Sequence, residues 1–163
     1  MKLAVTPLVG IIVGAGVLGG CGVDDGLTAT APVSTPSFYY YSCDLPDDEC
    51  TRLKQKLDAL AAHFANSSCE DLVNDALARY NHPSTDIGFR WGGTADGPDD
   101  PYGFILPGEY GNITRITSKG LEDLGPTAIH EEAHHQDWLV DGVTDLTESQ
   151  AEFIGMSCGS YAE

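Results

Sequence analysis

The segment His130-Glu131-Glu132-Ala133-His134 constrains this chain more than any other stretch. Two histidines four positions apart on an α-helix are separated by about 6 Å along the axis and by about 40° around it. Both imidazoles can then reach one tetrahedral zinc ion, and Glu131, from the same turn, can face a metal-bound water as a general base. The alternative is an acidic, histidine-rich surface helix that binds no metal.

The residues around this segment predict a helix over 126–140. Pro126 suits the first turn of a helix, and Gly142 stands where a helix would have ended. His135 points about 100° away from His134 around the helix, so it is expected beside the site or on the surface and not as a third ligand in the same plane. Glu132 is expected to be solvated. The apolar contacts of the helix can come from Ala128, Ile129, Ala133, Trp138 and Leu139.

A tetrahedral catalytic zinc site needs a third protein ligand and leaves its fourth position for water. Asp137 and Val140 stand where an H-x-x-G-x-x-H continuation would have its glycine and its third histidine, so that source of a ligand is absent. An aspartate, Asp141 or Asp145, is a second possible source. The third is a glutamate from the following helix.

That following helix has a clear start signal. Thr147 and Gln150 have the spacing of a capping box, which begins a helix just after Thr147. Glu148 and Glu152 are then one turn apart on the same face, and either carboxylate could reach the metal.

At this point the chain resembles the gluzincin branch of the zincin metallopeptidases, which pairs H-E-x-x-H with a glutamate on a second helix. Glu148-Ser149-Gln150-Ala151-Glu152-Phe153 is similar to the E-x-x-A-E-[FY] form of that helix. The resemblance covers about residues 125–155. It implies zinc ligands at His130, His134 and Glu148. It also implies Glu131 as the base and Glu152 as the partner that orients one imidazole, with Glu152 as the alternative third ligand.

Residues 1–20 have the features of a bacterial lipoprotein signal peptide. Lys2 precedes an apolar run from Leu8 to Leu18, and Leu18-Gly19-Gly20-Cys21 resembles the lipobox, after which cleavage leaves Cys21 as a lipid-modified N-terminus. The apolar run is short for a membrane-spanning helix. Residues 21–37 are rich in Thr, Ala, Pro, Ser and Gly and predict a flexible tether. We therefore expect a lipid anchor that holds the protein at the cell envelope, facing the periplasm or the exterior; the alternatives are an ordinary secretory peptide or an uncleaved anchor.

The other four cysteines predict two disulfides in an exported protein. Cys43 and Cys50 flank a polar loop and could close it locally, and Cys69 and Cys158 would then join an early helix to the end of the chain. The rival explanation is a cysteine-ligated zinc, although no C-x-x-C is present.

The remaining pattern predicts one α+β domain over 38–163. Apolar residues recur at helical spacing in 47–66 and 69–80, and short strands are expected at 86–91, 104–106 and 112–118. With the resemblance, this gives a small zincin-like domain: two N-terminal helices, a short twisted sheet, the H-E-x-x-H helix, and a C-terminal helix carrying Glu148. We expect the strand at 112–118 to hold a peptide substrate by strand addition. The loop at 92–103 is expected to be a solvated acidic loop, with a calcium site as the alternative.

The net charge of the chain argues against two classes of binding partner. The chain has 25 acidic and 8 basic residues, and its net charge of −17 disfavours binding to nucleic acid or to anionic lipid. The motifs favour a monomeric zinc metallohydrolase that acts on peptides or proteins, with Glu131 moving a proton from the zinc-bound water to the leaving amine. The alternative is a non-catalytic surface-binding lipoprotein with a structural or vestigial zinc. Candidates for stabilising the transition state are Tyr110, His82, His135 and Tyr161.

Overall fold

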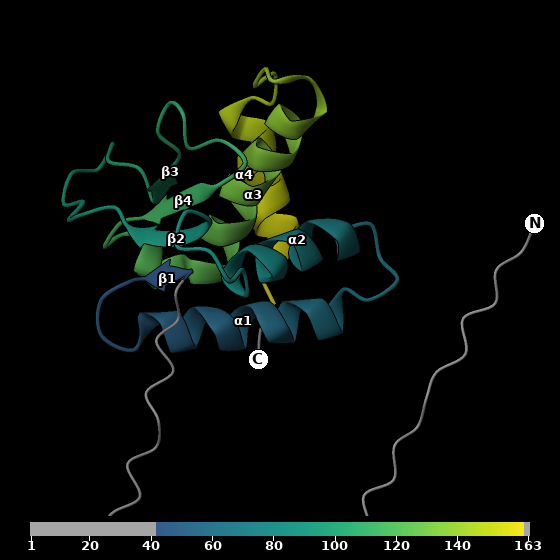
Figure 1. Cartoon of the computed structure of the whole chain (residues 1–163), viewed down its shortest axis with the longest axis horizontal. Helices are drawn as coiled ribbons and strands as arrows, with labels where there is room; N and C mark the ends of the chain where they lie inside the picture. The colour runs from purple at the N-terminus through teal and green to yellow at the C-terminus, as the bar shows by residue number, and fades with distance from the viewer. Residues whose placement is uncertain (1–41, 162–163) are drawn as a thin grey trace, which may run out of the picture. The chain divides into compact units, whose positions relative to one another are not determined.

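A computed structural model describes residues 42–161 and has the predicted α+β fold (Figure 1). The predicted signal peptide at 1–20, Cys21, the tether and the domain start at 38–41 lie outside the described residues. Within residues 42–161, no helix has both the length and the apolar character needed to cross a membrane. The elements in chain order are β1 (Cys43–Asp44), α1 (Glu49–His63), α2 (Glu70–Tyr80), β2 (Gly88–Trp91), β3 (Gly103–Phe104), β4 (Ile113–Ile116), the 3₁₀ helix η1 (Gly120–Asp123), α3 (Leu124–Asp141) and α4 (Glu148–Gly159).

The two N-terminal helices form where the apolar pattern predicts them. Each buries its apolar stripe, and α1 is shorter than the predicted 47–66 at both ends. Asp47 and Asn66 have positive φ angles of 51° and 62°, a conformation that an α-helix cannot include, so the helix is confined between them. The buried stripe residues are Leu53, Leu57 and Leu60 in α1 and Leu72, Val73, Ala76 and Tyr80 in α2.

The sheet has four strands in the order β1-β2-β4-β3. β1 and β2 pair in parallel, β2 and β4 also pair in parallel, and β3 pairs antiparallel with β4. β4 therefore has a neighbour on both sides, and the prediction that the strand at 112–118 offers a free edge to a peptide is wrong. β2 pairs with one edge of β4 and β3 pairs with the other, so β3 is the edge strand next to β4.

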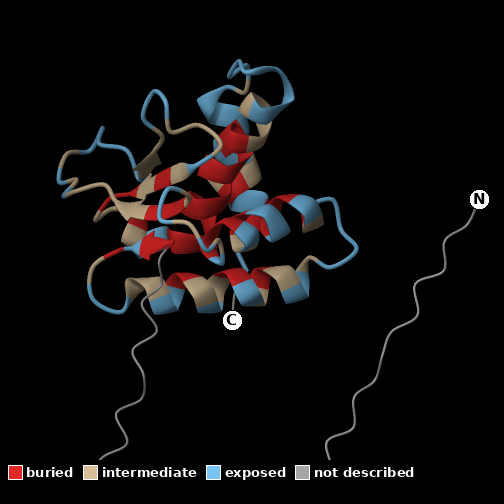
Figure 2. Ribbon diagram, viewed as in Figure 1, coloured by how far each residue is buried: buried red, intermediate tan, exposed pale blue. Residues whose placement is uncertain are grey.

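The core lies where α3 meets the sheet and the first two helices. Phe89 and Ile116 from the sheet are fully buried in one cluster with Ala128 and Ile129 from α3 and with the stripe leucines of α1. Figure 2 shows buried residues along α3 and on the face of α1 that is turned toward the rest of the domain. Burial of this apolar surface holds α3 in the middle of the fold.

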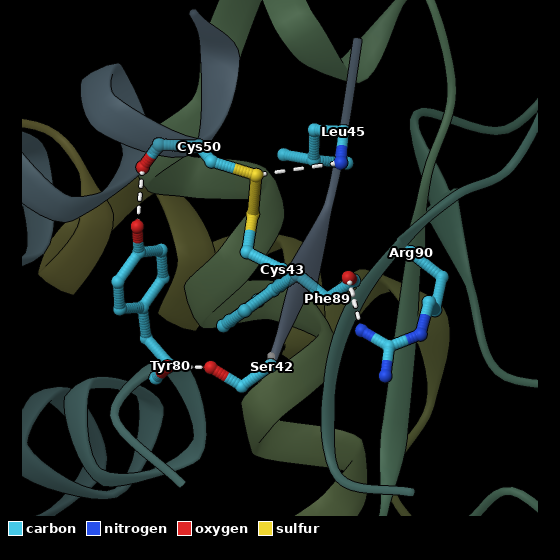
Figure 3. Close-up of a disulfide and its surroundings, with 7 residues drawn as sticks. All are labelled: Ser42, Cys43, Leu45, Cys50, Tyr80, Phe89 and Arg90. Atoms are coloured by element: carbon cyan, nitrogen blue, oxygen red, sulfur yellow. Dashed lines mark hydrogen bonds between the residues drawn. A yellow bond between two sulfur atoms is a disulfide. The ribbon is translucent and has the colours of Figure 1, made fainter. Parts of the chain in front are cut away.

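The predicted disulfide pairing is confirmed. Cys43 and Cys50 join β1 to α1, and the hydroxyl of Tyr80 donates to the Cys50 carbonyl at 2.9 Å beside this bond (Figure 3). Cys69 and Cys158 join the residue before α2 to the last turn of α4 across 89 positions of sequence. Two disulfides indicate a domain that folds in an oxidising compartment outside the cytoplasm.

A buried ion pair ties three segments together. Arg79 of α2 donates from Nε and Nη2 to the two carboxylate oxygens of Glu132 on α3, at 2.7 and 3.0 Å. Its Nη1 donates to the carbonyls of Gly111 and Asn112, just before β4, at 3.0 and 2.8 Å. Glu132 is only 1% exposed, so the prediction that it is solvated is wrong. Its partner lies 53 positions away in sequence, and the local pattern gives no sign of it.

We predict that Arg79→Ala lowers the free energy of unfolding by about 3–5 kcal/mol, because it leaves the Glu132 carboxylate buried without its counter-ion. Urea denaturation followed by circular dichroism measures this loss. Arg52→Ala is the matched control, since Arg52 pairs with Glu49 on the surface of α1 and its loss is expected to cost less than about 1 kcal/mol. Equal effects of the two substitutions would contradict the role given to the buried pair.

Candidate metal centre

Helix α3 presents His130 and His134 on one face, as the sequence predicts. The helix runs from Leu124 to Asp141, within two residues of the predicted range, and has Pro126 in its first turn. Gly142 ends it in the left-handed conformation, with φ of 79°, and donates its N–H to the Trp138 carbonyl at 2.7 Å. The two imidazole rings lie one turn apart with centroids separated by 5.1 Å.

Helix α4 begins at Glu148 because the predicted capping box forms. The hydroxyl of Thr147 accepts the Gln150 N–H, and the Gln150 side chain accepts the Thr147 N–H. A second contact fixes the loop from the α3 side: the Asp137 carboxylate accepts the N–H groups of Asp145 and Leu146 at 2.7 and 2.8 Å. The tight connection between the two helices is therefore held at both of its ends.

Glycines allow α4 to lie directly against α3 (Figure 1). A Cβ atom at Gly155 would be 2.7 Å from the Pro126 carbonyl oxygen and 3.0 Å from the His130 Cβ. A Cβ at Gly159 would be 2.5 Å from the Pro126 Cα. Any side chain at these two positions would push the helices apart, and with them Glu148 away from the histidines.

The close helix pair brings His130, His134 and Glu148 into one group that could hold a metal ion. His130 Nε2 lies 3.3 Å from Glu148 Oε2, and His134 Nε2 lies 3.4 Å from Glu148 Oε1. One ligand atom from each residue lies within 4.8 Å of the others. Ligand atoms about 2.0–2.1 Å from a tetrahedral zinc are about 3.4 Å apart, so the two histidine–glutamate distances match such a site, and the 4.8 Å span of the group would have to close slightly around the ion.

An orphaned nitrogen indicates that this group fits a metal. His134 Nε2 is buried and has no hydrogen-bond partner among the described residues. A buried imidazole nitrogen without a partner is destabilising, and a metal ion at this point would satisfy it. Two imidazoles and one carboxylate are also a ligand set that zinc accepts in catalytic sites.

The other proposed acidic ligands do not join the group. Glu152 is exposed, and among the described residues no hydrogen bond joins it to an imidazole. Its charge acts on His130 only as the smallest of the effects on that residue's pKa. Asp141 and Asp145 are exposed and do not belong to the group that could hold a metal. The role of Glu152 in orienting an imidazole stays a prediction.

The electrostatics of the site follow from burial. Burial and the neighbouring His134 lower the pKa of His130, while the Glu148 carboxylate opposes this, so the His130 lone pair is free at neutral pH. Burial, and then the charge of Glu148, raises the pKa of Glu131 to about 8. Glu131 is 5% exposed and lies under β3, where a Cβ at Gly103 would be 2.9 Å from its Oε1. A glycine is therefore required where β3 crosses this carboxylate.

His135 faces the interior and not the metal group. Its Nδ1 accepts the Gly111 N–H at 2.8 Å, so its proton sits on Nε2, which lies 3.0 Å from the Thr114 hydroxyl. Burial, the Arg79 charge and the neighbouring His134 lower its pKa to about 3. The neutral ring thus joins α3 to β4, and this pairing could not be read from the sequence.

Two cavities of about 610 and 410 Å³ flank the metal group and share His130, Glu131 and Glu148 as lining residues. Pro101 and Gly103, at the start of β3, line both on the opposite side. Tyr110 lines the larger cavity, with its ring stacked on Trp138 at a centroid distance of 6.1 Å. The other candidates for transition-state stabilisation, His82, His135 and Tyr161, line neither cavity.

Comparison with protein family models, with curated proteins and with solved structures found no match. Sequence reasoning missed Asp137 and Gly103, which shape the site without touching the metal position. The Asp137 contact could have been anticipated from the need for a tight loop, whereas the crossing of β3 over Glu131 depends on the sheet order.

We predict that the purified protein binds one zinc ion per chain, and that Glu148→Ala weakens binding at least about 100-fold, more than loss of a residue outside the ligand set. Glu152→Ala is the matched control one turn away and is expected to cost at most about tenfold. Competition with a chromogenic chelator measures both affinities. A larger loss in Glu152→Ala than in Glu148→Ala would contradict this assignment of the ligand.

Proposed function

We propose that the protein is a zinc-dependent metallohydrolase that acts on peptides or proteins. The position of Glu131 is the observation that carries this proposal. Its carboxylate is buried beside the His130, His134 and Glu148 group and faces both cavities. A structural zinc site is closed by a fourth protein ligand and needs no general base beside it. A catalytic site keeps the fourth position open for water. The resemblance to gluzincins supports the same function.

Glu131 has the properties of a proton carrier. When bound, zinc would act as a Lewis acid on a carbonyl and would lower the pKa of a coordinated water. Glu131 Oε1 lies 3.9 Å from His130 Nε2, so the carboxylate stands next to the ligand position. The positive charge of a bound metal would favour the ionised form of Glu131, whose pKa is otherwise raised to about 8, and the carboxylate could then take a proton from the attacking water and deliver it to the leaving amine. Tyr110 is the candidate that donates to the developing oxyanion, since it shares the larger cavity with both histidines.

An extended backbone fits the surroundings of the site. β3 is one of the two edge strands of the described sheet, and Gly103 and Phe104 line the larger cavity beside His130 and Glu131. A peptide that pairs with this edge would lie across the metal group. This arrangement favours peptides over small compact substrates. In this proposal β3, and not the strand at 112–118, is the strand that pairs with the peptide.

We also propose that the enzyme is tethered to the bacterial cell envelope through a lipid on Cys21. The support is the lipobox-like segment at 18–21, together with the two disulfides, which indicate an oxidising compartment. In this position the active site would meet peptides of the periplasm or the exterior.

Glu131→Gln is expected to reduce hydrolysis of a fluorogenic peptide library by about 100-fold or more while zinc content and fold are retained, because it removes the base and leaves the ligands in place. Glu122→Gln is the control, since Glu122 is exposed and lines neither cavity. Turnover that survives Glu131→Gln would overturn the mechanism. A zinc-loaded wild-type protein that binds peptides without cleaving them would instead identify a non-catalytic binding protein.

A further inference from the structure

The two cavities beside the metal group differ sharply in charge. The smaller is lined by Asp99 and Asp100 from the loop before β3, by Asp123 at the start of α3, and by Glu152 from α4. The larger has Asp145 as its one acid besides Glu131 and Glu148, and its wall includes the apolar residues Phe104, Ile105 and Leu146. The cleft thus has a strongly acidic half and a half with fewer acids, with the metal group between them.

The acids of the smaller cavity are available to a ligand. Asp99, Asp123 and Glu152 are exposed, and their carboxylates take part in no hydrogen bond or ion pair among residues 42–161. Asp100 uses Oδ2 to accept the Gly97 N–H at 2.7 Å and keeps its other oxygen for a ligand. Asp99, Asp123 and Glu152 therefore have both carboxylate oxygens available to a bound cation, and Asp100 has one.

The cation that lines the same cavity is committed elsewhere. The ammonium group of Lys119 donates to the carbonyls of Pro98 and Asp100 at 3.0 and 2.9 Å, and it lies 4.8 Å from the centre of the Tyr102 ring. These contacts hold the acidic loop around Lys119, so the hydrogen bonds of this ammonium group go to loop carbonyls and not to the side-chain carboxylates. The side-chain carboxylates of Asp99 and Asp100 still outnumber this single positive charge.

A second observation ties this acidic cavity to a ligand. Glu131 is 5% exposed, its carboxylate accepts no hydrogen bond among the described residues, and it lines this cavity together with His130 and Glu148. A buried carboxylate without a hydrogen bond is expected to meet a ligand, a water or an ion. The acidic residues therefore surround the entrance to the reacting position and not a remote patch of surface.

We propose that the smaller cavity binds the cationic side chain of a lysine or arginine, which lies next to the bond that is cleaved, while the larger cavity receives the neighbouring side chain. The position of the cleaved bond rests on the proposed function. The selection of a cation does not, because it follows from the unpaired carboxylates of the smaller cavity together with the buried Glu131 carboxylate that lines it.

Long-range attraction does not explain the same preference. The chain has a net charge of −17, so it attracts cations in general at low salt. This general field is screened beyond about 8 Å at physiological ionic strength, whereas carboxylates in contact with a bound side chain are screened much less. A change of charge inside the cavity must then have a larger effect than the same change elsewhere.

The test measures binding to the zinc-loaded Glu131→Gln protein, which does not consume its ligand. The probe is a fluorescein-labelled peptide with adjacent leucine and lysine residues, and the reference is the same peptide with its lysine Nζ acetylated. By fluorescence anisotropy at about 0.15 M salt, we expect the lysine peptide to bind about five- to tenfold more tightly, the combined effect of two or three exposed ion pairs. Equal affinity for the two peptides would overturn the proposal.

Paired substitutions locate the effect. Asp99→Asn with Asp123→Asn is expected to reduce the preference for lysine to less than about twofold. Asp71→Asn with Asp86→Asn removes the same charge from exposed positions that line neither cavity, and it is expected to leave the preference intact. The same loss in both pairs would attribute the preference to net charge and would overturn the proposed pocket.

Hydrolysis by the wild-type protein separates this inference from the proposed function. A lysine preference in binding without any cleavage would contradict the metallohydrolase and support the cation pocket. Cleavage that is equally fast for the lysine and acetyl-lysine peptides would support the metallohydrolase and contradict the pocket.

Discussion

The buried pair of Arg79 and Glu132 is the interaction on which the placement of the site depends. It joins α2 to α3 and, through the Gly111 and Asn112 carbonyls, to the segment that enters β4. A paired charge at this depth is costly to separate, so the angular position of α3 about its own axis is strongly determined. The rotation that buries Glu132 and His135 on one side turns His130 and His134 toward α4 on another.

Six consecutive residues of α3 therefore serve two purposes. Glu132 and His135 hold the helix in the domain, while His130, Glu131 and His134 line the cleft. Because successive residues of an α-helix point about 100° apart, a run of acids and histidines can serve both the interior and the cleft. Some of the glutamates and histidines that suggest a metal site in the sequence are therefore structural. The fold determines which of them face the interior and which face the cleft.

Local patterns predicted the elements and much of the candidate site. The spacing of His130 and His134, the capping box at Thr147 and the stripes of α1 and α2 depend on residues close together in sequence, and the structure has each of them. The sheet order could not be predicted, because the parallel pairing of β2 with β4 brings together segments with no local signal. For the same reason the edge role of β3 and the burial of Glu132 became visible only in three dimensions.

The cleft gains its character from parts of the chain that are distant in sequence. The loop before β3 supplies the acids of one cavity, and the loop after α3 supplies Leu146 to the other. The metal group stands where these two surfaces meet, so charge selection and bond cleavage would take place on one bound chain.

The coordination of zinc in the loaded protein is the measurement that tests the central claim most directly. X-ray absorption at the zinc edge is expected to show two imidazole nitrogens and oxygen ligands from one carboxylate and one water, at about 2.0–2.2 Å. Substitution of His130 by alanine should remove the scattering of one imidazole. A spectrum without imidazole scattering, or a folded protein that retains no zinc, would contradict the assignment of His130, His134 and Glu148 as a metal centre.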